Sequence, residues 1–332
     1  MKALILAPFS SAALERLNQS MEVTYENWMD TQKLLSPEEF VERIQGQDIA
    51  ILVVEADFLP REVFEKATKL KFVGVCRADV SHIDMEAATE HGVPVVNTPA
   101  RNAIAVAELT IGLMLSLARM IPEAHNMVRS RQWVDPTGAY FTLRGTELTG
   151  KTIGIVGFGA IGRQVATRLS AFDTTILAYD PFLPPEQVRE LGAEQVELDD
   201  LMARSDIVTI HCSVTPDSMG LLDARRIALM KPTAYLVNAA STFVIDNEAI
   251  IQALREKRIA GAAFDVYETW PVRPDSPLLE LDNVVLTPHI GGATAETLVR
   301  YSQWIVDDIE RFLRAERPVH LLNPQVWDKG AR

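Results

Sequence analysis

Short apolar runs alternate with segments of helical period along most of the chain. Runs such as 49–54, 72–76 and 152–156 are apolar at nearly every position, which is typical of strands buried on both faces of a sheet. Strands of this kind separated by helices predict an α/β fold in which helices cover both faces of parallel sheets. The expected strands are 2–8, 23–25, 49–54, 72–76, 93–96, 152–156, 175–179, 207–211, 234–238, 260–265 and 284–286, and the expected helices are 11–18, a helix starting at Ser36, 60–70, 83–90, 163–171 and 295–314.

A longer helix is predicted over 102–130. From 104 to 121 it is apolar on nearly every face, so we expect it to lie between domains or between subunits. The polar residues Glu108 and Arg119 favour a buried helix over a membrane span, and Glu108 fits an interdomain hydrogen-bonding group better than a catalytic acid. Pro122 is expected to kink or restart this helix.

Composition and charge narrow the class of protein. The 332 residues are 48% hydrophobic and 23% charged, with a formal net charge of −13. Nucleic-acid binding needs clustered Lys and Arg, so we expect no nucleic-acid partner. Cys76 and Cys212 lie in apolar runs and are expected to be buried thiols in a reducing compartment. No Cys/His spacing suggests a metal, and the run 1–8 is predicted to be a strand rather than a signal peptide, so we expect a cytoplasmic protein without a membrane segment.

Three glycines in G-x-G-x-x-G spacing follow the strand 152–156. Gly157 permits the tight turn from strand to helix, Gly159 lets a pyrophosphate approach the backbone, and Gly162 lets helix and strand pack closely. The helix that follows offers free N–H groups to the phosphates. Asp180, which ends the next strand, is placed to accept a hydrogen bond from a ribose hydroxyl and would repel a 2′-phosphate. This pattern predicts NAD binding, preferred over NADP; a bare structural turn is the alternative.

Polar residues follow several other predicted strands. Ligands of an open parallel sheet bind beyond the carboxyl ends of its strands, so these residues are expected to converge on one cleft facing the first domain around Arg77-Ala78-Asp79. The strand-end segments are His211-Cys212-Ser213, Asn238-Ala239-Ala240-Ser241-Thr242, Asp265 and Pro288-His289-Ile290-Gly291-Gly292.

At these residues the chain resembles the D-isomer-specific 2-hydroxyacid dehydrogenase family, especially its phosphoglycerate dehydrogenase branch. The resemblance implies a flavodoxin-like substrate domain built from 1–100 and 293–332, and a Rossmann NAD-binding domain over 101–292. It also implies a small-molecule substrate and a homodimer formed largely through the NAD-binding domains. The segments that carry it are Val95-Val-Asn-Thr-Pro99, Asn102-Ala-Ile-Ala-Val-Ala-Glu-Leu109, the glycine loop, Ala178-Tyr-Asp-Pro181, Ser205-Asp-Ile-Val-Thr-Ile-His-Cys212, Met230-Lys-Pro232, Ala260-Gly-Ala-Ala-Phe-Asp-Val266 and Asn283-Val-Val-Leu-Thr-Pro-His-Ile-Gly-Gly-Ala-Thr294.

The resemblance also implies how the cofactor is held. Asp265 would bind the nicotinamide carboxamide, although a plain strand-end role is the alternative. Ala160 and Ile161 would meet the pyrophosphate. The candidate cofactor-binding residues are Gly157, Gly159, Ala160, Ile161, Gly162, Asp180, His211, Cys212, Ser213, Ala239, Ala240, Asp265, His289 and Gly291.

The sequence departs from the family at the reacting end of the site. The family uses an Arg that clamps the substrate carboxylate, a His that exchanges the hydroxyl proton, and a Glu that hydrogen-bonds this His. The His is present as His289, but Ser241 stands at the Arg position and Trp270 at the Glu position. The first-domain segment R-A-G, whose backbone amides hold the carboxylate, ends here in Asp79.

These replacements change what the site can bind. An Arg fork gives a carboxylate two charge-assisted hydrogen bonds, whereas a serine hydroxyl gives at most one neutral bond. Asp79 would repel a carboxylate if it faces the pocket, and Trp270 supplies an apolar wall with one N–H donor. The site is therefore poorly suited to a small 2-oxo acid.

Three interpretations stay open. The protein is an NAD-dependent oxidoreductase with a changed substrate such as a polyol or sugar, with Asp79 accepting from hydroxyls or partnering His289 and Trp270 stacking on a sugar face. Alternatively, it is an ordinary 2-hydroxyacid dehydrogenase in which Arg77 or another cation rebuilds the clamp. A third alternative is an inactive NAD-binding sensor or interaction protein. His82, close to Asp79, is a further polar candidate in the cleft, although an exposed helix-cap neighbour is the favoured interpretation. Glu268 is expected to point elsewhere, as the family geometry implies, and a swing toward His289 is the alternative.

Overall fold

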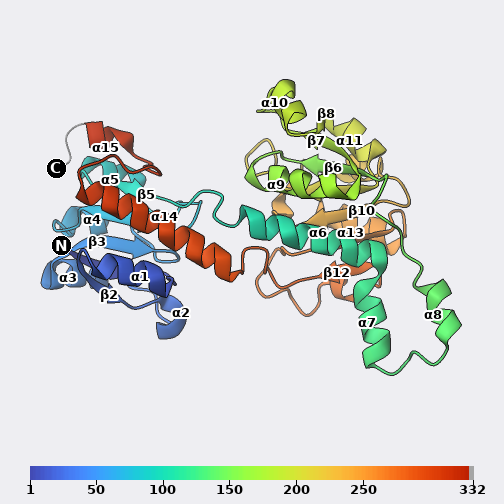
Figure 1. Ribbon diagram of the computed structural model, residues 1–332, viewed down its shortest axis with the longest axis horizontal. Helices are drawn as coiled ribbons and strands as arrows, with labels where there is room; N and C mark the ends of the chain where they lie inside the picture. The colour runs from blue at the N-terminus through green and yellow to red at the C-terminus, as the bar shows by residue number, and fades with distance from the viewer. Residues whose placement is uncertain (329–332) are drawn as a thin grey trace. The chain divides into compact units, whose positions relative to one another are not determined.

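The computed structural model describes residues 1–328, and the chain divides into two compact units (Figure 1). Unit 1 contains residues 1–101 and the chain from 294 onwards, and unit 2 contains residues 102–293. Each unit has its own parallel sheet with helices packed on it, as the alternating pattern predicts. The expected α/β class with two doubly wound sheets is confirmed.

Unit 1 is built on a five-stranded sheet in the order β2-β1-β3-β4-β5. All its pairings are parallel, and the order is that of flavodoxin-like folds. Its strands are β1 (Lys2–Ile5), β2 (Glu22–Tyr25), β3 (Ile49–Val54), β4 (Phe72–Val75) and β5 (Val95–Val96), and its helices are α1 (Ser11–Asn18), α2 (Trp28–Thr31), α3 (Pro37–Gln47), α4 (Arg61–Lys66), α5 (Met85–Glu90), α14 (Ala295–Leu313) and α15 (Pro324–Asp328).

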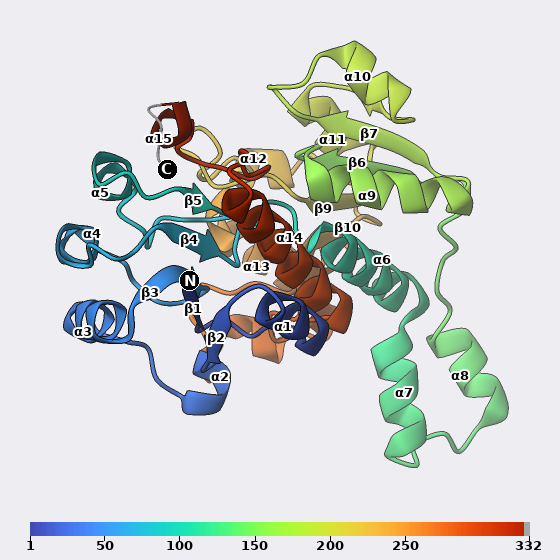
Figure 2. The same cartoon turned by 60° about the vertical axis from the view of Figure 1, so that its left-hand side comes forward.

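The segment from residue 294 onwards belongs to unit 1. Helix α14 packs on α1 and on β4 (Figure 2), and the Tyr301 hydroxyl donates to the Pro8 carbonyl at 2.8 Å. Further on, the Asn323 side chain accepts from the Val95 N–H at 2.9 Å and donates to the Val93 carbonyl at 2.9 Å. The first and last parts of the described chain therefore share one core.

Unit 2 carries a seven-stranded parallel sheet in the order β12-β11-β10-β9-β6-β7-β8. The order places the strand of the glycine motif, β6, next to β9, where the winding of the sheet reverses. Its strands are β6 (Thr152–Val156), β7 (Thr175–Tyr179), β8 (Glu194–Gln195), β9 (Ile207–Ile210), β10 (Tyr235–Asn238), β11 (Gly261–Phe264) and β12 (Val284–Leu286), and its helices are α6 (Ala103–Arg119), α7 (Ile121–Arg129), α8 (Pro136–Thr142), α9 (Ala160–Leu169), α10 (Pro185–Glu190), α11 (Leu198–Arg204), α12 (Ala224–Ile227) and α13 (Asn247–Arg255), with short 3-10 turns η1 (Ser170–Phe172), η2 (Thr242–Val244) and η3 (Pro277–Glu280).

The long helix predicted over 102–130 is two helices. Met120 adopts a left-handed conformation (φ 52°), which ends α6 and leaves Pro122 in the first turn of α7, where proline is tolerated. The two helices meet at 67°. Helix α6 packs on α9 and on strands β10 to β12, so its apolar faces are buried in the core of unit 2 itself. Its expected place between domains or subunits is therefore not needed to explain its composition.

Several boundaries differ from the prediction by a few residues. Helix α4 ends at Lys66 rather than at 70, and α5 begins after the cap Asp84. Helix α9 begins at Ala160, three residues earlier than predicted, so the last glycine of the motif lies inside it. The capping box at the start of α3 is confirmed, because Ser36 and Glu39 each accept from the other's backbone N–H.

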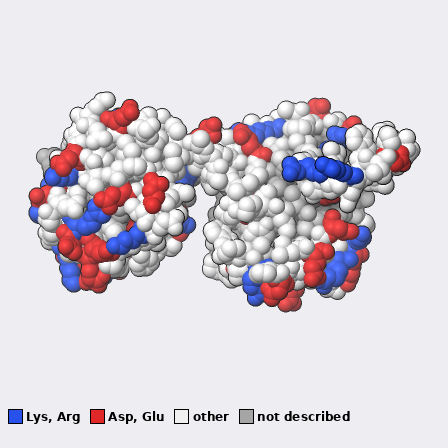
Figure 3. Space-filling model, turned by 90° about the horizontal axis from the view of Figure 1, so that it is seen from below, with Lys and Arg blue, Asp and Glu red and all other residues white. Residues whose placement is uncertain are grey.

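Two surface properties bear on partners. Within residues 1–328 no single helix is long and apolar enough to cross a membrane, although α6 and α7 together reach that length and composition as a bent pair. On the face drawn in Figure 3, Lys and Arg side chains are interspersed with Asp and Glu and form no broad basic patch. The cytoplasmic location stays a prediction.

Candidate active site

The glycine loop between β6 and α9 is sterically specified. Gly157 has φ +93°, and a Cβ there would lie 2.4 Å from the Cys212 backbone nitrogen. A Cβ on Gly162 would lie 2.3 Å from the Gly157 carbonyl oxygen, so helix and loop touch directly. Gly159 differs from both, because no atom lies within 4 Å of its missing Cβ. The loop therefore leaves open space at Gly159, next to the first turn of α9 that holds Ala160.

Asp180 follows β7 and is bound to the same loop. Its carboxylate accepts from the Phe158 N–H at 2.9 Å and from the Phe182 N–H at 3.0 Å. The residue is 9% exposed, yet it lines a cavity of about 410 Å³ at the carboxyl ends of β6, β7 and β9. Asp180 thus holds the loop in place and presents its remaining lone pairs to the cavity.

This cavity, termed here the nucleotide cavity, gathers part of the predicted cofactor set. It also includes residues that the sequence did not indicate, notably Phe182 and Asp217. No Lys or Arg is among its lining residues. Those residues are Val156, Gly157, Gly159, Tyr179, Asp180, Pro181, Phe182, His211, Cys212, Ser213, Thr215, Asp217, Ser218 and Leu221.

His211 is a buried polar side chain that lines this cavity. Its Nε2 lies 2.9 Å from the Thr209 hydroxyl oxygen, and its Nδ1 has no hydrogen-bond partner within residues 1–328. Burial lowers the pKa of His211 to about 3, so the imidazole is neutral at pH 7. Next to it, burial raises the pKa of the Cys212 thiol to about 11, which makes a reactive thiolate there unfavourable.

Asp265, which follows β11, holds the loop that carries His289. Its carboxylate accepts from the Thr287 hydroxyl at 2.6 Å, from the Ile290 N–H at 2.9 Å and from the Gly291 N–H at 2.7 Å. A Cβ on Gly291 would lie 2.9 Å from one carboxylate oxygen, so the glycine permits this approach. Asp265 is 2% exposed. The structure brings Asp265, His289 and Gly291 together at the ends of the neighbouring strands β11 and β12.

The His289 ring lies against the Trp270 indole. The two ring centroids are 3.9 Å apart, with the planes tilted by 54°. His289 has a left-handed backbone (φ 55°), and its N–H donates to the Thr287 carbonyl at 2.9 Å. Partial burial lowers the pKa of His289, and the negative charge of Asp265 opposes that shift. Both rings line a largely apolar cavity of about 330 Å³ with Tyr267, Pro271, Val272, Leu279, Leu286, Thr287 and Pro288.

Ser241 belongs to a turn after β10. The Asn238 amide oxygen accepts from the backbone N–H groups of Ala240 and Ser241, and its amide nitrogen donates to the Ser241 carbonyl. The Ser241 hydroxyl accepts from the Phe243 N–H at 3.2 Å and caps η2. Ala239 and Ala240 are half-buried in this turn. The serine is therefore used locally, and nothing at this position offers a positive charge.

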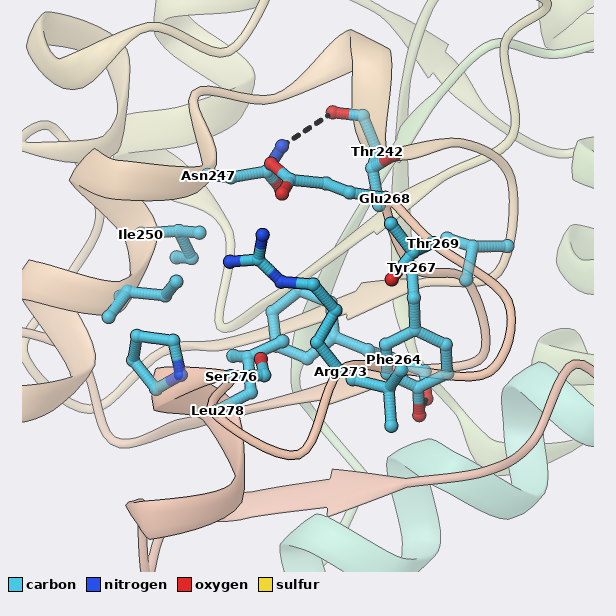
Figure 4. A pocket seen from close by; sticks show the side chains of 14 residues that line it. Thr242, Asn247, Ile250, Phe264, Tyr267, Glu268, Thr269, Arg273, Ser276 and Leu278 are labelled. Atoms are coloured by element: carbon cyan, nitrogen blue, oxygen red, sulfur yellow. Dashed lines mark hydrogen bonds between the residues drawn. The ribbon is translucent and has the colours of Figure 1, made fainter.

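Glu268 lies in a different cavity, of about 80 Å³ (Figure 4). Figure 4 shows its carboxylate beside the Asn247 side chain, with the Arg273 guanidinium reaching toward both, while the Asn247 amide donates to the Thr242 carbonyl at 3.2 Å. Neither Trp270 nor His289 lines this cavity.

In unit 1, Arg77, Ala78 and Asp79 form an exposed loop after β4. The Asn97 amide donates to the Ala78 carbonyl at 2.7 Å. The Asp79 carboxylate accepts from the Ser81 hydroxyl at 2.6 Å, and this bond lowers the pKa of Asp79. Burial lowers the pKa of His82. The expectation that this loop faces the strand ends of unit 2 stays a prediction.

The described residues contain no group of three or more His, Cys, Asp or Glu that could hold a metal ion. Residues 111–291 match the family model described as D-isomer specific 2-hydroxyacid dehydrogenase, NAD binding domain. This chain belongs to that family. Members of this family are oxidoreductases that act on CH–OH donors with NAD or NADP. The resemblance noted in the sequence is thereby confirmed.

Two relatives differ in how much of their own length this chain covers. The chain is 39% identical over 323 residues to the D-3-phosphoglycerate dehydrogenase of Methanocaldococcus jannaschii, covering 97% of this chain and 59% of the relative. It is 42% identical over 292 residues to the glyoxylate reductase of Thermofilum pendens, covering 88% of this chain and 86% of the relative. The chain thus spans little more than half the length of the phosphoglycerate dehydrogenase relatives.

Solved structures have the same architecture. The apo-structure of D-lactate dehydrogenase from Escherichia coli matches with a TM-score of 0.78 and 29% identity, over 97% of this chain and all of that chain. An acyclic imino acid reductase in complex with NADPH and D-Arg matches with a TM-score of 0.79 and 27% identity, again over 97% of this chain and all of that one. A structure with the same architecture was thus solved with NADPH, and membership of the family alone does not choose between NAD and NADP.

Proposed function

We propose that this chain transfers a hydride between NAD and a CH–OH carbon that bears no carboxylate, as in a polyol or sugar. The observation that carries this proposal is the use of Ser241. Its hydroxyl caps η2, so the position at which the family resemblance implies a carboxylate clamp holds a local structural bond instead. A carboxylate there would lose the two charge-assisted bonds that an Arg fork provides.

The glycine loop suits the pyrophosphate of a dinucleotide. The open space at Gly159 and the free N–H groups of the first turn of α9 favour a phosphate at that point. Ala160 and Ile161 would meet it from that first turn, with Gly162 keeping the helix close to the loop. The unpartnered Nδ1 of His211 also lines the nucleotide cavity.

NAD rather than NADP is the proposed cofactor. Asp180 and Asp217 both line the nucleotide cavity, and no Lys or Arg lines it. Two carboxylates repel a 2′-phosphate, whereas Asp180 has lone pairs to accept from ribose hydroxyls. Phe182, which is 81% exposed at the cavity, offers an aromatic face to the adenine. Cys212 and Ser213 are assigned to line the rest of the cofactor site, and Ala239 and Ala240 are assigned to the part that holds the nicotinamide.

His289 is assigned as the base that takes the hydroxyl proton when the alcohol is oxidised. A base that receives a proton must be neutral beforehand, and the lowered pKa of His289 favours the neutral form at pH 7. Asp265 keeps the His289 loop in place and would also bind the carboxamide. When bound, the nicotinamide supplies the carbon that accepts the hydride. Asp79 would accept from substrate hydroxyls, and Trp270 would border the substrate.

A rebuilt carboxylate clamp is the second candidate. Arg77 is exposed and forms no ion pair within residues 1–328, so its guanidinium is available. The relatives named glyoxylate reductase and D-3-phosphoglycerate dehydrogenase support a 2-oxo acid substrate. This candidate and an inactive NAD-binding protein are the other outcomes of the experiment.

The deciding experiment follows absorbance at the NADH band in both directions. NADH is offered with a panel of 2-oxo acids, and NAD with polyols, sugars and sugar acids. Turnover only on substrates without a carboxylate at the reacting carbon supports the proposal. Turnover on 2-oxo acids contradicts it and favours a clamp at Arg77, which Arg77→Ala then tests. No turnover on either panel, with NADH still bound, identifies a binding protein.

A homodimer is proposed through the α7–α8 segment of unit 2. This segment exposes apolar side chains, among them Trp133 at 55%, Val134 at 87% and Tyr140 at 73%. Apolar exposure of this extent on neighbouring residues is typical of a covered interface. Sedimentation analysis of the wild type and of Val134→Asp should show a dimer and a monomer; a monomeric wild type contradicts the proposal.

A further inference from the structure

The His289 side chain lacks a polar partner. Within residues 1–328 no hydrogen bond reaches either ring nitrogen of His289. Its backbone is fixed, because its N–H donates to Thr287 and the next two N–H groups donate to Asp265. The Asp265 carboxylate already accepts three hydrogen bonds, so it holds the loop rather than the ring. Something else must determine how the imidazole points.

Trp270 is placed to do this. Its ring centroid lies 3.9 Å from that of His289, which is direct contact between the two rings. The other polar groups of this loop are directed elsewhere. The Tyr267 hydroxyl donates to the Thr287 carbonyl at 2.9 Å, and Glu268 lies in the separate cavity with Arg273. Figure 4 shows Glu268 on the side of Asn247 and Thr242.

We propose that Trp270 is the positioning residue of His289, and that its indole holds the imidazole through an apolar ring contact in place of a charged hydrogen bond. The inference rests on the proposed role of His289 as the base. Trp270 is 66% exposed, so it is not needed to fill the core of unit 2. Large aromatic side chains are usually buried, so a largely exposed one in contact with the His289 ring is better explained by a role in the site than by core packing.

The proposal predicts that the site favours alcohol oxidation over ketone reduction. An indole cannot stabilise an imidazolium as a carboxylate does, because it carries no negative charge. The charged and titratable groups near the imidazole are Asp265 and Tyr267, both already bound to the backbone or to Thr287. The neutral imidazole therefore persists to lower pH, which favours proton removal from an alcohol over proton delivery to a ketone.

The first test titrates His289 by NMR in the full-length protein labelled at its six histidines. His289→Ala assigns the signal. Trp270→Glu should raise the pKa of His289 by about one unit or more, since an opposite charge at this distance favours the charged form. Trp270→Phe should leave it within about 0.3 units, because the ring contact remains. Glu268→Gln, a change on the same loop, should leave it unchanged. Identical titration in wild type, Trp270→Ala and Trp270→Glu overturns the proposal.

The second test uses the pH profile of turnover on the best substrate of the panel. Trp270→Glu should move the rise of oxidation with pH to higher pH and speed the reduction direction at pH 7. Trp270→Ala should lower kcat about 10-fold by loss of orientation, with a smaller change in KM. If His289→Ala turns over normally, the base role fails, whereas the NMR result still reports on the ring contact. Unmoved pH profiles in all three Trp270 variants overturn the positioning role.

Discussion

Two groups of loops at the same edge of the unit 2 sheet differ in the side chains that they carry. The loops after β6 and β7 bring glycine and Asp180 against the backbone, with Gly157 against Cys212 and Asp180 bonded to two backbone N–H groups. The loops after β10 and β11 also bind backbone N–H groups, at Asn238 and Asp265, but they carry partly exposed side chains at two further positions. There, Ser241 and Trp270 stand where the family resemblance implies an Arg and a Glu.

The difference shows which part of such a site can change. A side chain longer than glycine at position 157 or 162 would collide with backbone atoms, so the cofactor half permits little variation. At positions 241 and 270 the side chains are partly or largely exposed, and no backbone atom is described as pressed against them in the way that Cys212 lies against Gly157. A new substrate can therefore be accepted at one end of the sheet while the other end keeps its nucleotide geometry.

The largest expected effect is the loss of turnover when His289, in the half of the site that carries the proposed chemistry, is replaced. His289→Ala should lower turnover by ~100-fold or more, the usual contribution of a general base, and leave NADH affinity nearly intact. Steady-state rates and fluorescence titration with NADH measure the two quantities. His91→Ala, an exposed histidine that follows α5, is the matched control. Unchanged turnover in His289→Ala would remove this residue from the mechanism.

The next prediction compares two glycines of the glycine loop, one expected to matter for stability and one for NADH binding. Gly157→Ala puts a Cβ 2.4 Å from the Cys212 nitrogen at positive φ, and should lower the free energy of unfolding by about 2–3 kcal/mol. Gly159→Ala meets no protein atom and should keep Tm, yet weaken NADH binding about 10-fold or more. Thermal denaturation and NADH titration of both variants measure this. Equal effects of the two changes on Tm would contradict the assignment of the open space.

A third prediction concerns acid stability. The folded pKa of His211, about 3, is lower than the ordinary value of 6.5, so the unfolded state binds an extra proton between these pH values. Stability contributed by the neutral His211 is therefore present above pH 6.5 and falls as the pH decreases from 6.5 toward 3, by on the order of 2 kcal/mol at pH 5. Urea denaturation of wild type and His211→Gln should give curves that diverge below pH 6.5. Parallel curves from pH 8 to pH 5 would count against a buried neutral imidazole.

The smallest expected effect sharpens the choice of cofactor. Asp180→Ala should narrow the NAD/NADP affinity ratio about 10-fold, because one of two carboxylates near the ribose is lost. The ratio is used because loosening of the loop at Phe158 would weaken both cofactors alike. Asp217→Ala, in the same cavity, should change the ratio less, since it lies farther along the loop after β9. An unaltered ratio in Asp180→Ala would contradict the ribose role.

The sequence predicted several strands of unit 2 best. Strands β6, β7 and β12 match the predicted ranges to the residue, because they are short apolar runs bounded by polar or turn-forming residues. The break at Met120 was placed only approximately, since a non-glycine residue in the left-handed region reflects tertiary packing rather than local preference. Helix α8 was not predicted, because its seven residues carry no apolar stripe.

The site divides in the same way. The glycine loop and the strand ends could be located because their positions follow from spacing and from the edge of a parallel sheet. Asp217 and Phe182 line the nucleotide cavity from irregular loops. Such loops show no repeating pattern of apolar and polar residues, so the sequence does not indicate which of their side chains face the cavity. The resemblance places Trp270 where the family has the Glu that hydrogen-bonds this His, so the two residues were expected to be neighbours. The ring-to-ring contact itself depends on how two loops fold against each other.

The composition of unit 1 from two distant segments links its folding to synthesis. The residues of unit 2 are synthesised as one continuous stretch. In unit 1, by contrast, strand β4 packs against α14, which is synthesised much later: a Cβ built on Gly74 would lie 3.2 Å from the Ile305 side chain. Until then, one face of the first sheet, including Phe72, which later packs on Phe312, lacks its cover. Unit 2 can therefore form once residues 102–293 have been synthesised, whereas unit 1 becomes complete only after α14 has followed.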